Sequence, residues 1–352
     1  MNKPLLITMG DGAGIGPEII AKAFRDAPAE LVGCVVVGDV ATLRRASALM
    51  AAPLAWPVAQ LESLADALSL PPRCLPVLQK CELPVPVPYG LVSSLAGQAA
   101  ADCIVWAARA VLAGEASAMV TAPIHKEALA AAGGWVAGFP GHTEMLQAEA
   151  AAFLGKPVSE VPVRMMLAND ELKTVLVSIH MSLRDAVEAV TFDNLLQTLR
   201  ITHRAVAASL GRAPRIAVAG LNPHAGEGGL FGSEEQAIIA PAIAAARAEG
   251  LDVSGPFAPD TVFMRARHAP GHVGEFDVVV AMYHDQGLIP VKYLGVEQGV
   301  NVTLGLPLVR TSPDHGTAFD IAGTGRADAS SLRAAIRMAR QLAGSEYQEK
   351  WL

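Results

Sequence analysis

Residues 276–310 read FDVVVAMYHDQGLIPVKYLGVEQGVNVTLGLPLVR, and this stretch decides how the chain is interpreted. Its first part, Phe276 to Met282, is apolar and β-branched, which is typical of a buried strand in a parallel sheet. His284 and Asp285 follow, and either side chain can bind a metal or transfer a proton. Later polar residues are isolated among glycines and apolar residues: Lys292, Asn301 and Arg310. Because a solvated surface would carry many more charges, this spacing indicates a functional site.

Two further histidines stand in the same position relative to a predicted strand. His180 ends the run that begins at Leu176, and His224 follows the run Ile216 to Gly220 after a short connection. Open α/β sheets bind ligands at the carboxyl ends of their strands, and neutral imidazole is the commonest metal ligand in proteins. A single histidine at such a place is more often structural. Three in matching positions predict a shared divalent metal held by His180, His224 and His284.

The composition limits the classes of function. The chain has 352 residues, of which 52% are hydrophobic, so it can bury a large core and is expected to form two domains. A net charge of -7 and a pI near 5.7 leave no basic surface field, which argues against a nucleic-acid partner. The basic residues near the candidate site are therefore expected to bind a small anion.

The cysteines and the apolar segments indicate the cell compartment. The four cysteines form no C-x-x-C pair and no zinc-binding spacing, which is typical of reduced thiols in a cytosolic protein. The apolar run from Leu5 to Met9 is too short for the core of a signal peptide, and we find no uninterrupted membrane span. We therefore expect a soluble, cytoplasmic protein without a membrane partner.

Predicted strands alternate with predicted helices, which favours a mostly parallel α/β fold. Two of the predicted helices run from about Pro17 to Phe24 and near Phe192 to Leu210. The first strand, near Pro4 to Met9, is followed by the glycine-rich segment Gly10 to Glu18. A dinucleotide fingerprint fails there, because the third glycine position holds Ile15 in one register and Pro17 in the other. We reject the ordinary Rossmann interpretation. The segment remains either a tight active-site turn or a purely structural one.

Other loops divide the chain. The proline-rich segment Pro71 to Pro88 is interpreted as an irregular connection, and Gly133 to Gly141 as a domain boundary. The loop Thr121 to Lys126 follows a predicted strand and is expected to contact ligand, although His125 could simply begin a helix. Thr143 precedes another predicted helix, whose N-terminus could be capped by this side chain or could bind an anion.

The chain resembles the 4-hydroxythreonine-4-phosphate dehydrogenase family of vitamin B6 synthesis from Leu5 to about Leu342. The segments that carry the resemblance are Gly10–Glu18, Gly141–Glu144, Leu221–Gly229, Met282–Gly287 and Gly299–Pro307. The resemblance implies the isocitrate/isopropylmalate dehydrogenase-like fold, with two α/β domains and an active-site cleft between them. It also implies a homodimer with the active site near the subunit interface. We expect a cofactor-side domain of residues 1–132 plus 300–352, and a metal-, substrate-binding and dimerisation domain of residues 133–299.

The resemblance also implies roles for individual residues. It places a metal shared between subunits on His180, His224 and His284. It assigns substrate binding to His142, Thr143, Lys292, Asn301 and Arg310. The segment Asp314 to Gly323 resembles the loop that holds the adenosine of NAD or NADP in the wider superfamily, with cofactor-binding positions Asp314, His315, Gly316, Thr317 and Ala318. A nicotinamide cofactor is therefore expected without a Rossmann fingerprint.

The implied reaction oxidises 4-phosphohydroxy-L-threonine at C3 to 2-amino-3-oxo-4-phosphooxybutanoate, which decarboxylates to 3-amino-2-oxopropyl phosphate. An alcohol ionises only near a pKa of roughly 16, whereas a bound divalent ion can lower the pKa of water to about 7. Zinc, magnesium or cobalt is the expected metal. Lys292 and Arg310 would neutralise the substrate phosphate. The catalytic proton acceptor stays open between Asp260, Asp285 and Lys292.

Three alternatives remain. Sister enzymes that oxidise D-threonate or D-erythronate 4-phosphate share the metal and many of the motifs. A metal-dependent sugar-phosphate isomerase or aldolase would also suit three histidines and a phosphate clamp. A regulator that binds a phosphorylated metabolite on a former enzyme fold would have no reason to keep the histidine set. Lys292, Asn301 and Arg310 favour a phosphorylated substrate over a cyclic diol, but do not separate an amino acid from its hydroxy-acid analogue.

Overall fold

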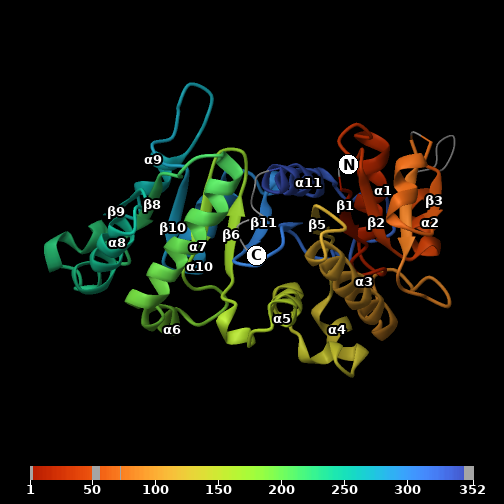
Figure 1. Cartoon of the computed structure of the whole chain (residues 1–352), viewed down its shortest axis with the longest axis horizontal. Helices are drawn as coiled ribbons and strands as arrows, with labels where there is room; N and C mark the ends of the chain where they lie inside the picture. Colours follow the sequence, from red (N-terminus) through yellow and green to blue (C-terminus); the bar gives the residue numbers. More distant parts are fainter. Residues whose placement is uncertain (1–2, 50–55, 72, 345–352) are drawn as a thin grey trace. The chain divides into compact units, whose positions relative to one another are not determined.

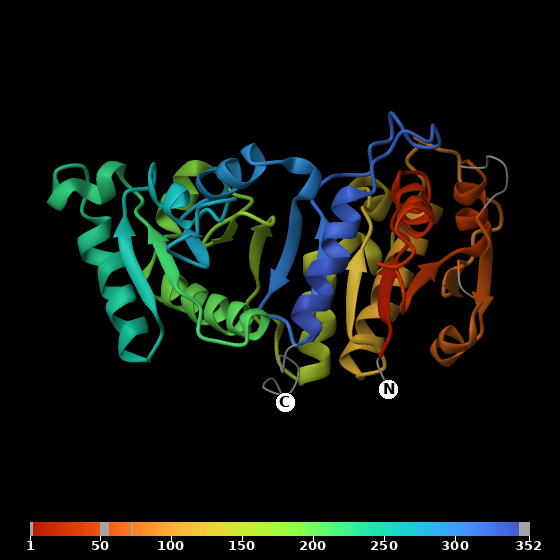
Figure 2. The same cartoon turned by 90° about the horizontal axis from the view of Figure 1, so that it is seen from above.

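The computed structural model describes residues 3–49, 56–71 and 73–344, which form two compact units (Figures 1 and 2). Unit 1 comprises Met1–Pro162 and Leu306–Ala343, and unit 2 comprises Val163–Gly305. Both contain strands and helices, so the predicted α/β fold class is confirmed. Residues 133–162 belong to unit 1 and residues 300–305 to unit 2, whereas the sequence-based division placed each of these segments in the other domain.

Unit 1 is built on six parallel strands in the order β3-β4-β2-β1-β5-β12. Their bounds are β1 Leu5–Thr8, β2 Cys34–Gly38, β3 Val58–Leu61, β4 Leu75–Gln79, β5 Ala118–Thr121 and β12 Arg310–Pro313. Every residue of the central strands β1, β2 and β5 is buried. This burial on both faces explains why their sequences are continuous apolar runs and do not alternate.

Helices cover the sheet of unit 1. They are α1 Gly16–Asp26, α2 Val40–Ala48, α3 Ser94–Leu112, α4 Lys126–Ala132, α5 His142–Leu154 and α11 Ser330–Ala343. Helix α3 packs against β1, β2 and β5, and α11 packs against β5 and β12 on the opposite side (Figure 1). The first helix begins at Gly16, one residue before the predicted start, and has the predicted proline in its first turn.

Helix α3 is long and apolar enough to cross a membrane by length and composition alone. Most of its surface is buried inside the protein, and its buried side is formed largely by alanines. A long alanine-rich helix that packs on a sheet is expected in the core of a soluble protein. The composition of α3 therefore reflects its packing against β1, β2 and β5.

Unit 2 is built on a mixed sheet in the order β11-β6-β7-β10-β8-β9. Strand β6 pairs antiparallel with both β11 and β7, whereas β7, β10, β8 and β9 are parallel to one another. Their bounds are β6 Arg164–Ala168, β7 Lys173–Leu176, β8 Ile216–Ala219, β9 Val253–Phe257, β10 Val278–Ala281 and β11 Val300–Leu304. Strand β10 lies between β7 and β8 and is fully buried, as its β-branched sequence predicts.

Two long elements cover opposite faces of this second sheet (Figure 2). Helix α7, Phe192–Leu210, has the bounds that the sequence predicted, with Thr191 as its N-cap and the left-handed Gly211 as its C-cap. Helix α10, His284–Tyr293, covers the other face. The remaining helices are α6 Leu183–Glu188, α8 Ala240–Ala248 and α9 Val262–Ala266, with a π-helical turn, η5, at Glu235–Ile239.

The interpretation of Pro71 to Pro88 as an irregular connection is wrong. The segment contains β4, which pairs with β2 on one side and β3 on the other. Leu75 and Val77 point into the core and are fully buried. Pro76 lies between them, and a proline argues against a central strand because it has no N–H to donate. The proline content therefore hid a strand that tertiary packing stabilises.

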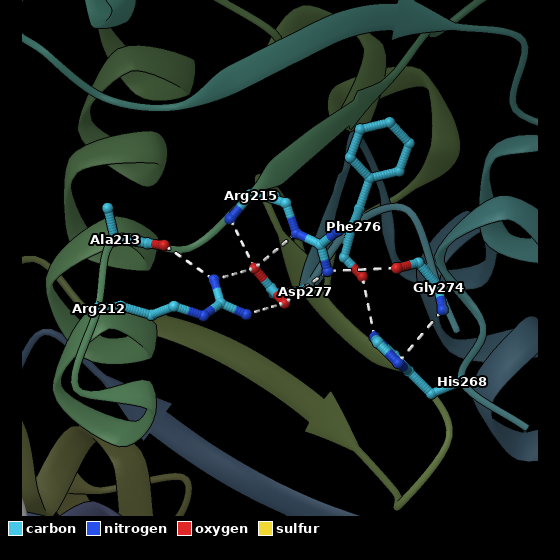
Figure 3. A network of polar contacts seen from close by, with 7 residues as sticks. All are labelled: Arg212, Ala213, Arg215, His268, Gly274, Phe276 and Asp277. Carbon is cyan, nitrogen blue, oxygen red and sulfur yellow. Dashed lines mark hydrogen bonds and ion pairs between the residues drawn. The ribbon is translucent and has the colours of Figure 1, made fainter. Parts of the chain in front are cut away.

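A buried carboxylate fixes the start of the strand that leads to His284. Asp277 directly precedes β10 and accepts hydrogen bonds from both terminal nitrogens of Arg212, each at 2.8 Å, and from the backbone N–H of Arg215 at 2.7 Å (Figure 3). Arg215 directly precedes β8 and also donates from its side chain. Burial alone would raise the pKa of Asp277, but these donors hold it far below its ordinary value. The cluster therefore ties together the amino ends of β8 and β10.

Replacing Asp277 with asparagine should lower the free energy of unfolding by about 2–3 kcal/mol at neutral pH, because charged hydrogen bonds are lost in a buried setting. A carboxylate with a depressed pKa stabilises the fold above its unfolded-state value of about 3.9, and this contribution is lost as the pH falls through the lower folded-state pKa. The difference between the two proteins should therefore shrink as the pH falls below about 4. Urea denaturation followed by far-ultraviolet circular dichroism measures it.

The matched control is Glu275→Gln, which breaks an exposed ion pair with Arg265 in the same region. Exposed pairs contribute little, so this variant should unfold almost as the wild type does. A stability difference for Asp277→Asn that stays constant from neutral pH to about pH 3 would contradict the role assigned to the carboxylate.

Candidate functional site

Three neighbouring strands of unit 2 each deliver a histidine at one edge of the sheet. His180 follows β7, His284 follows β10 and His224 follows β8, and β10 pairs parallel with both neighbours. Parallel strands end at the same edge, so all three histidines come after carboxyl ends, as the sequence predicted. Each histidine comes just beyond its strand for the same local reason: the buried apolar run ends there and the first polar residues follow.

His180 and His284 lie close together. Their ring centroids are 5.9 Å apart, and both rings line a cavity of about 650 Å³. The other lining residues are Ile179, Met181, Leu183, Ala186, Tyr283 and Asp285. The Nδ1 atom of His284 is 2.7 Å from a carboxylate oxygen of Asp285, so Nδ1–H can donate to it and leave Nε2 available to a metal. Metal-binding histidines are usually oriented by such a carboxylate, so the pair fits a divalent metal.

His224 is not brought to this pair within one chain. Among the residues that the structure describes, no three His, Cys, Asp or Glu side chains are grouped closely enough to hold a metal. His224 is exposed on a left-handed loop, with its ring centroid 6.2 Å from that of Phe231. A single chain therefore supplies two of the three predicted metal ligands together and the third separately.

The other predicted residues of unit 2 lie on separate elements. Asp260 is exposed and follows β9, at the carboxyl end of a parallel strand. Lys292 is exposed near the end of α10, about two turns beyond His284. Asn301 is half-buried in β11, opposite Leu167 of β6. These positions leave Asp260 and Lys292 accessible to a ligand.

In unit 1, three loops pack together at the carboxyl ends of the parallel strands β1, β5 and β12. The backbone N–H of Ile15 donates to the carbonyl oxygen of Thr317 at 3.0 Å. A Cβ at Gly14 would lie 2.9 Å from the same oxygen, so only glycine allows this approach. The ring of His125 stacks on Phe319 with centroids 4.5 Å apart. The first glycine-rich loop and the Thr121–Lys126 loop thus support the predicted cofactor-binding loop.

Buried polar atoms remain unpaired around these loops. Asp11 Oδ2, His125 Nδ1 and His315 Nε2 are inaccessible and have no hydrogen-bond partner within the described part of the chain. Burial raises the pKa of Asp11 above its ordinary value. Because buried polar groups are normally satisfied, these atoms fit a bound polar ligand such as a dinucleotide. The residues present are therefore compatible with the expected nicotinamide cofactor.

A buried arginine lies near the same edge of unit 1. Arg310 is only 4% exposed, and its Nε and Nη2 donate to the hydroxyl of Thr121 at 3.0 and 2.7 Å. Burial lowers the pKa of Arg310 to about 10, so the guanidinium stays charged at neutral pH. Thr121 is the last residue of β5, separated from Arg310 by 189 positions, and no local signal in the sequence identifies the pair. A charge held in this way favours an anionic ligand.

His142 completes an anion-binding group with Arg310. It is the first residue of α5, and its buried Nε2 has no hydrogen-bond partner among the residues described. Burial, and then the positive charge of Arg310, hold the pKa of His142 well below its ordinary value, so the imidazole is neutral. The N-cap of α5 is Gly141, without a side-chain cap, so the interpretation of Thr143 as the N-cap is wrong. The open helix N-terminus adds positive potential for an anion.

Known proteins resemble this chain over almost its full length. Residues 30–339 match the family described as pyridoxal phosphate biosynthetic protein PdxA. A 4-hydroxythreonine-4-phosphate dehydrogenase from Beijerinckia indica subsp. indica is 52% identical over 342 residues, which cover 97% of this chain and 96% of that protein. A D-threonate 4-phosphate dehydrogenase from Pectobacterium atrosepticum is 43% identical over 343 residues, which cover 97% of this chain and 100% of that protein. The crystal structure of a 4-hydroxythreonine-4-phosphate dehydrogenase from Klebsiella pneumoniae superposes with a TM-score of 0.84 at 42% sequence identity. The superposition covers 97% of this chain and 100% of that one.

The environment of His142 predicts how it titrates. In the ligand-free protein its imidazole should remain neutral at about pH 6, where an unperturbed histidine with a pKa of about 6.5 is mostly protonated. Histidine-selective ¹⁵N NMR distinguishes the two forms, and the variant His142→Gln assigns the signal by its loss. A protonation midpoint near the ordinary value would show that Arg310 and burial do not act on this ring as the geometry indicates.

Proposed function

The chain belongs to the PdxA family of pyridoxal phosphate biosynthetic proteins, and on this basis we propose that it is a dehydrogenase that oxidises 4-phosphohydroxy-L-threonine at C3 with NAD or NADP. The observation that carries the proposal is the buried anion-binding group of Arg310, Thr121 and His142. A phosphorylated substrate requires a charge of this kind, whereas a neutral diol does not. The loop Asp314 to Ala318 would hold the cofactor, supported by Gly14 and His125.

We assign the metal ligands to His180, His224 and His284. His180 and His284 would act together from one chain, and His224 would reach the metal of a second copy, which agrees with a homodimer whose site is shared between subunits. Imidazole donors suit zinc or cobalt better than magnesium, which prefers oxygen. When bound, the metal would supply Lewis-acid chemistry that makes the substrate alcohol easier to ionise.

The protein residues would bind the substrate and move its proton. Arg310 would bind the phosphate through its guanidinium, with His142, Thr143 and the α5 N-terminus as further donors. Lys292 and Asn301 would hold the remaining polar groups of the substrate. Asp285 already bonds His284, so it is better suited to orient that ring than to accept a proton. This leaves Asp260 and Lys292 as the candidate bases.

The reaction then balances as an oxidation followed by loss of carbon dioxide. The hydroxyl proton goes to the base, and hydride leaves C3 for the nicotinamide ring, which is reduced by two electrons. The product is a β-keto acid, so the bond between C2 and the carboxyl carbon can break with its electron pair delocalised into the new ketone. Carbon dioxide leaves, and protonation of the resulting enolate gives 3-amino-2-oxopropyl phosphate. Because the anion-binding group holds the phosphate, it limits which hydroxyl of the substrate can face the cofactor.

A second substrate is favoured by one observation. The 43% identical relative from Pectobacterium atrosepticum is named for D-threonate 4-phosphate, which differs from the first substrate in carrying a hydroxyl in place of the amine. The anion-binding group would accept either phosphate. We place both activities in a soluble, cytoplasmic enzyme, which agrees with the burial of α3 and the four free cysteines.

The function is tested by steady-state reduction of NAD and NADP with 4-phosphohydroxy-L-threonine, D-threonate 4-phosphate and D-erythronate 4-phosphate in parallel. We expect the highest efficiency with the first substrate, and one carbon dioxide released per hydride transferred when its carboxyl carbon is labelled. Mass spectrometry follows the label. No cofactor reduction with any of the three substrates would favour an isomerase or aldolase, and a label retained in the product would exclude oxidation at C3.

Arg310→Ala should lower the catalytic efficiency on the phosphorylated substrate by about 10- to 150-fold, because a charged hydrogen bond contributes about 1.5–3 kcal/mol. The matched control is Arg109→Ala, which removes an exposed arginine of the same unit that pairs with Glu149. This control should leave the efficiency almost unchanged. Equal efficiencies for wild type and Arg310→Ala would show that Arg310 has only a structural role.

A further inference from the structure

The loop that carries His224 has an unusual backbone. Five consecutive residues, His224 to Gly228, adopt left-handed conformations, with φ between 43° and 79°. Only glycine adopts this region without cost, yet three of the five are His224, Ala225 and Glu227. Strained backbone of this kind persists only where the surroundings hold it, and it concentrates at functional sites.

A buried carboxylate provides that restraint. Glu235 is 3% exposed, and its Oε1 accepts hydrogen bonds from the backbone N–H groups of Leu221 and Asn222, both at 2.7 Å. Its Oε2 accepts from the side-chain amide of Asn222 at 3.0 Å. A Cβ at Gly226 would lie 2.7 Å from this Oε2, so the loop closes directly over the carboxylate. Glu235 thus fixes the entry to the loop by hydrogen bonds and lies directly against its midpoint at Gly226.

The carboxyl end of β8, where the His224 loop begins, is also tied to the segment that carries His284. The side-chain amide of Gln286 donates to the carbonyl oxygen of Gly220 at 2.8 Å, and its oxygen accepts from the backbone N–H of Met282 at 2.7 Å. Gly220 directly precedes the two residues that bond Glu235. The start of the His224 loop is therefore fixed on one side by Glu235 and on the other by a residue of α10.

We propose that Glu235 is the positioning residue of His224, holding the left-handed loop in the conformation from which this imidazole binds the metal. The proposal rests on the assignment of His224 as a metal ligand. Glu235 does not itself contact the metal. It acts through three hydrogen bonds to Leu221 and Asn222 and through its contact with Gly226. Residues that orient metal ligands typically change metal affinity by about 10- to 100-fold when replaced.

The test is the affinity of the full-length protein for cobalt(II), followed by its visible absorption, with circular dichroism and thermal unfolding as measures of folding. Glu235→Gln keeps the size of the side chain but places an amide N–H₂ where an acceptor is needed, and it should weaken cobalt binding by about 10- to 100-fold. The control Glu234→Gln removes a charge from the neighbouring position, which bonds the side chain of Asn222 while the backbone N–H groups of Leu221 and Asn222 bond Glu235, and should bind cobalt nearly as the wild type does.

A second variant tests the same contact without removing the carboxylate of Glu235. Gly226→Ala keeps the carboxylate but forces a Cβ against its Oε2, so it should weaken cobalt binding in the same direction. His224→Ala should also weaken binding, and Glu235→Gln should then cause no further loss in the His224→Ala background, because the two residues act on one interaction. An independent, additive loss would overturn the positioning role.

The outcomes separate this inference from the proposed function. If His224→Ala binds cobalt as tightly as the wild type, the assignment of His224 as a metal ligand is wrong and the inference falls with it. If His224→Ala weakens binding but Glu235→Gln and Gly226→Ala do not, the metal site stands and the positioning role is wrong. Glu235→Gln with reduced thermal stability and unchanged cobalt affinity would make Glu235 a structural residue only.

Discussion

Parallel pairing of β10 with β7 and β8 is the constraint on which the rest of unit 2 depends. Paired in parallel, the three strands must end at the same edge of the sheet, so the residues that follow them are gathered there whatever their distance in sequence. The pairing in turn needs apolar residues on both faces, which the sequences of these strands supply. Asp277 and its two arginines fix the opposite edge, where β8 and β10 begin.

Unit 1 follows the same plan with different chemistry. Its strands β1, β5 and β12 are also parallel neighbours, and their loops gather buried groups that suit anions and a polar cofactor. Desolvation dominates here, since it lowers the pKa values of both Arg310 and His142. A charged arginine beside a neutral histidine offers a buried positive charge without a large basic surface. This agrees with the low pI of the chain, because the positive charge that matters is buried.

Polar groups that support another residue of the site take a large part in shaping these sites. Asp285 pairs with Nδ1 of His284, Thr121 holds the guanidinium of Arg310, and Glu235 supports a backbone that its own sequence disfavours. The contacts of Thr121 and Glu235 exist because a buried donor or acceptor requires a partner, whereas Asp285 and His284 pair at an exposed position. The chemistry of the supported residue therefore depends on a second residue that the sequence pattern does not single out.

The sequence by itself determined the α/β class, the main buried strands and helix α7, because apolar runs, glycines and caps act over a few residues. It also determined the family, through long segments such as Gly299 to Pro307. It did not determine β4, where Pro76 gave a local signal against a strand that its neighbours stabilise. Only the tertiary structure decided that His180 and His284 meet while His224 stays apart, and that Thr121 binds Arg310 from 189 positions away. These pairings depend on which strands lie side by side, and strand order is set by packing across the whole unit.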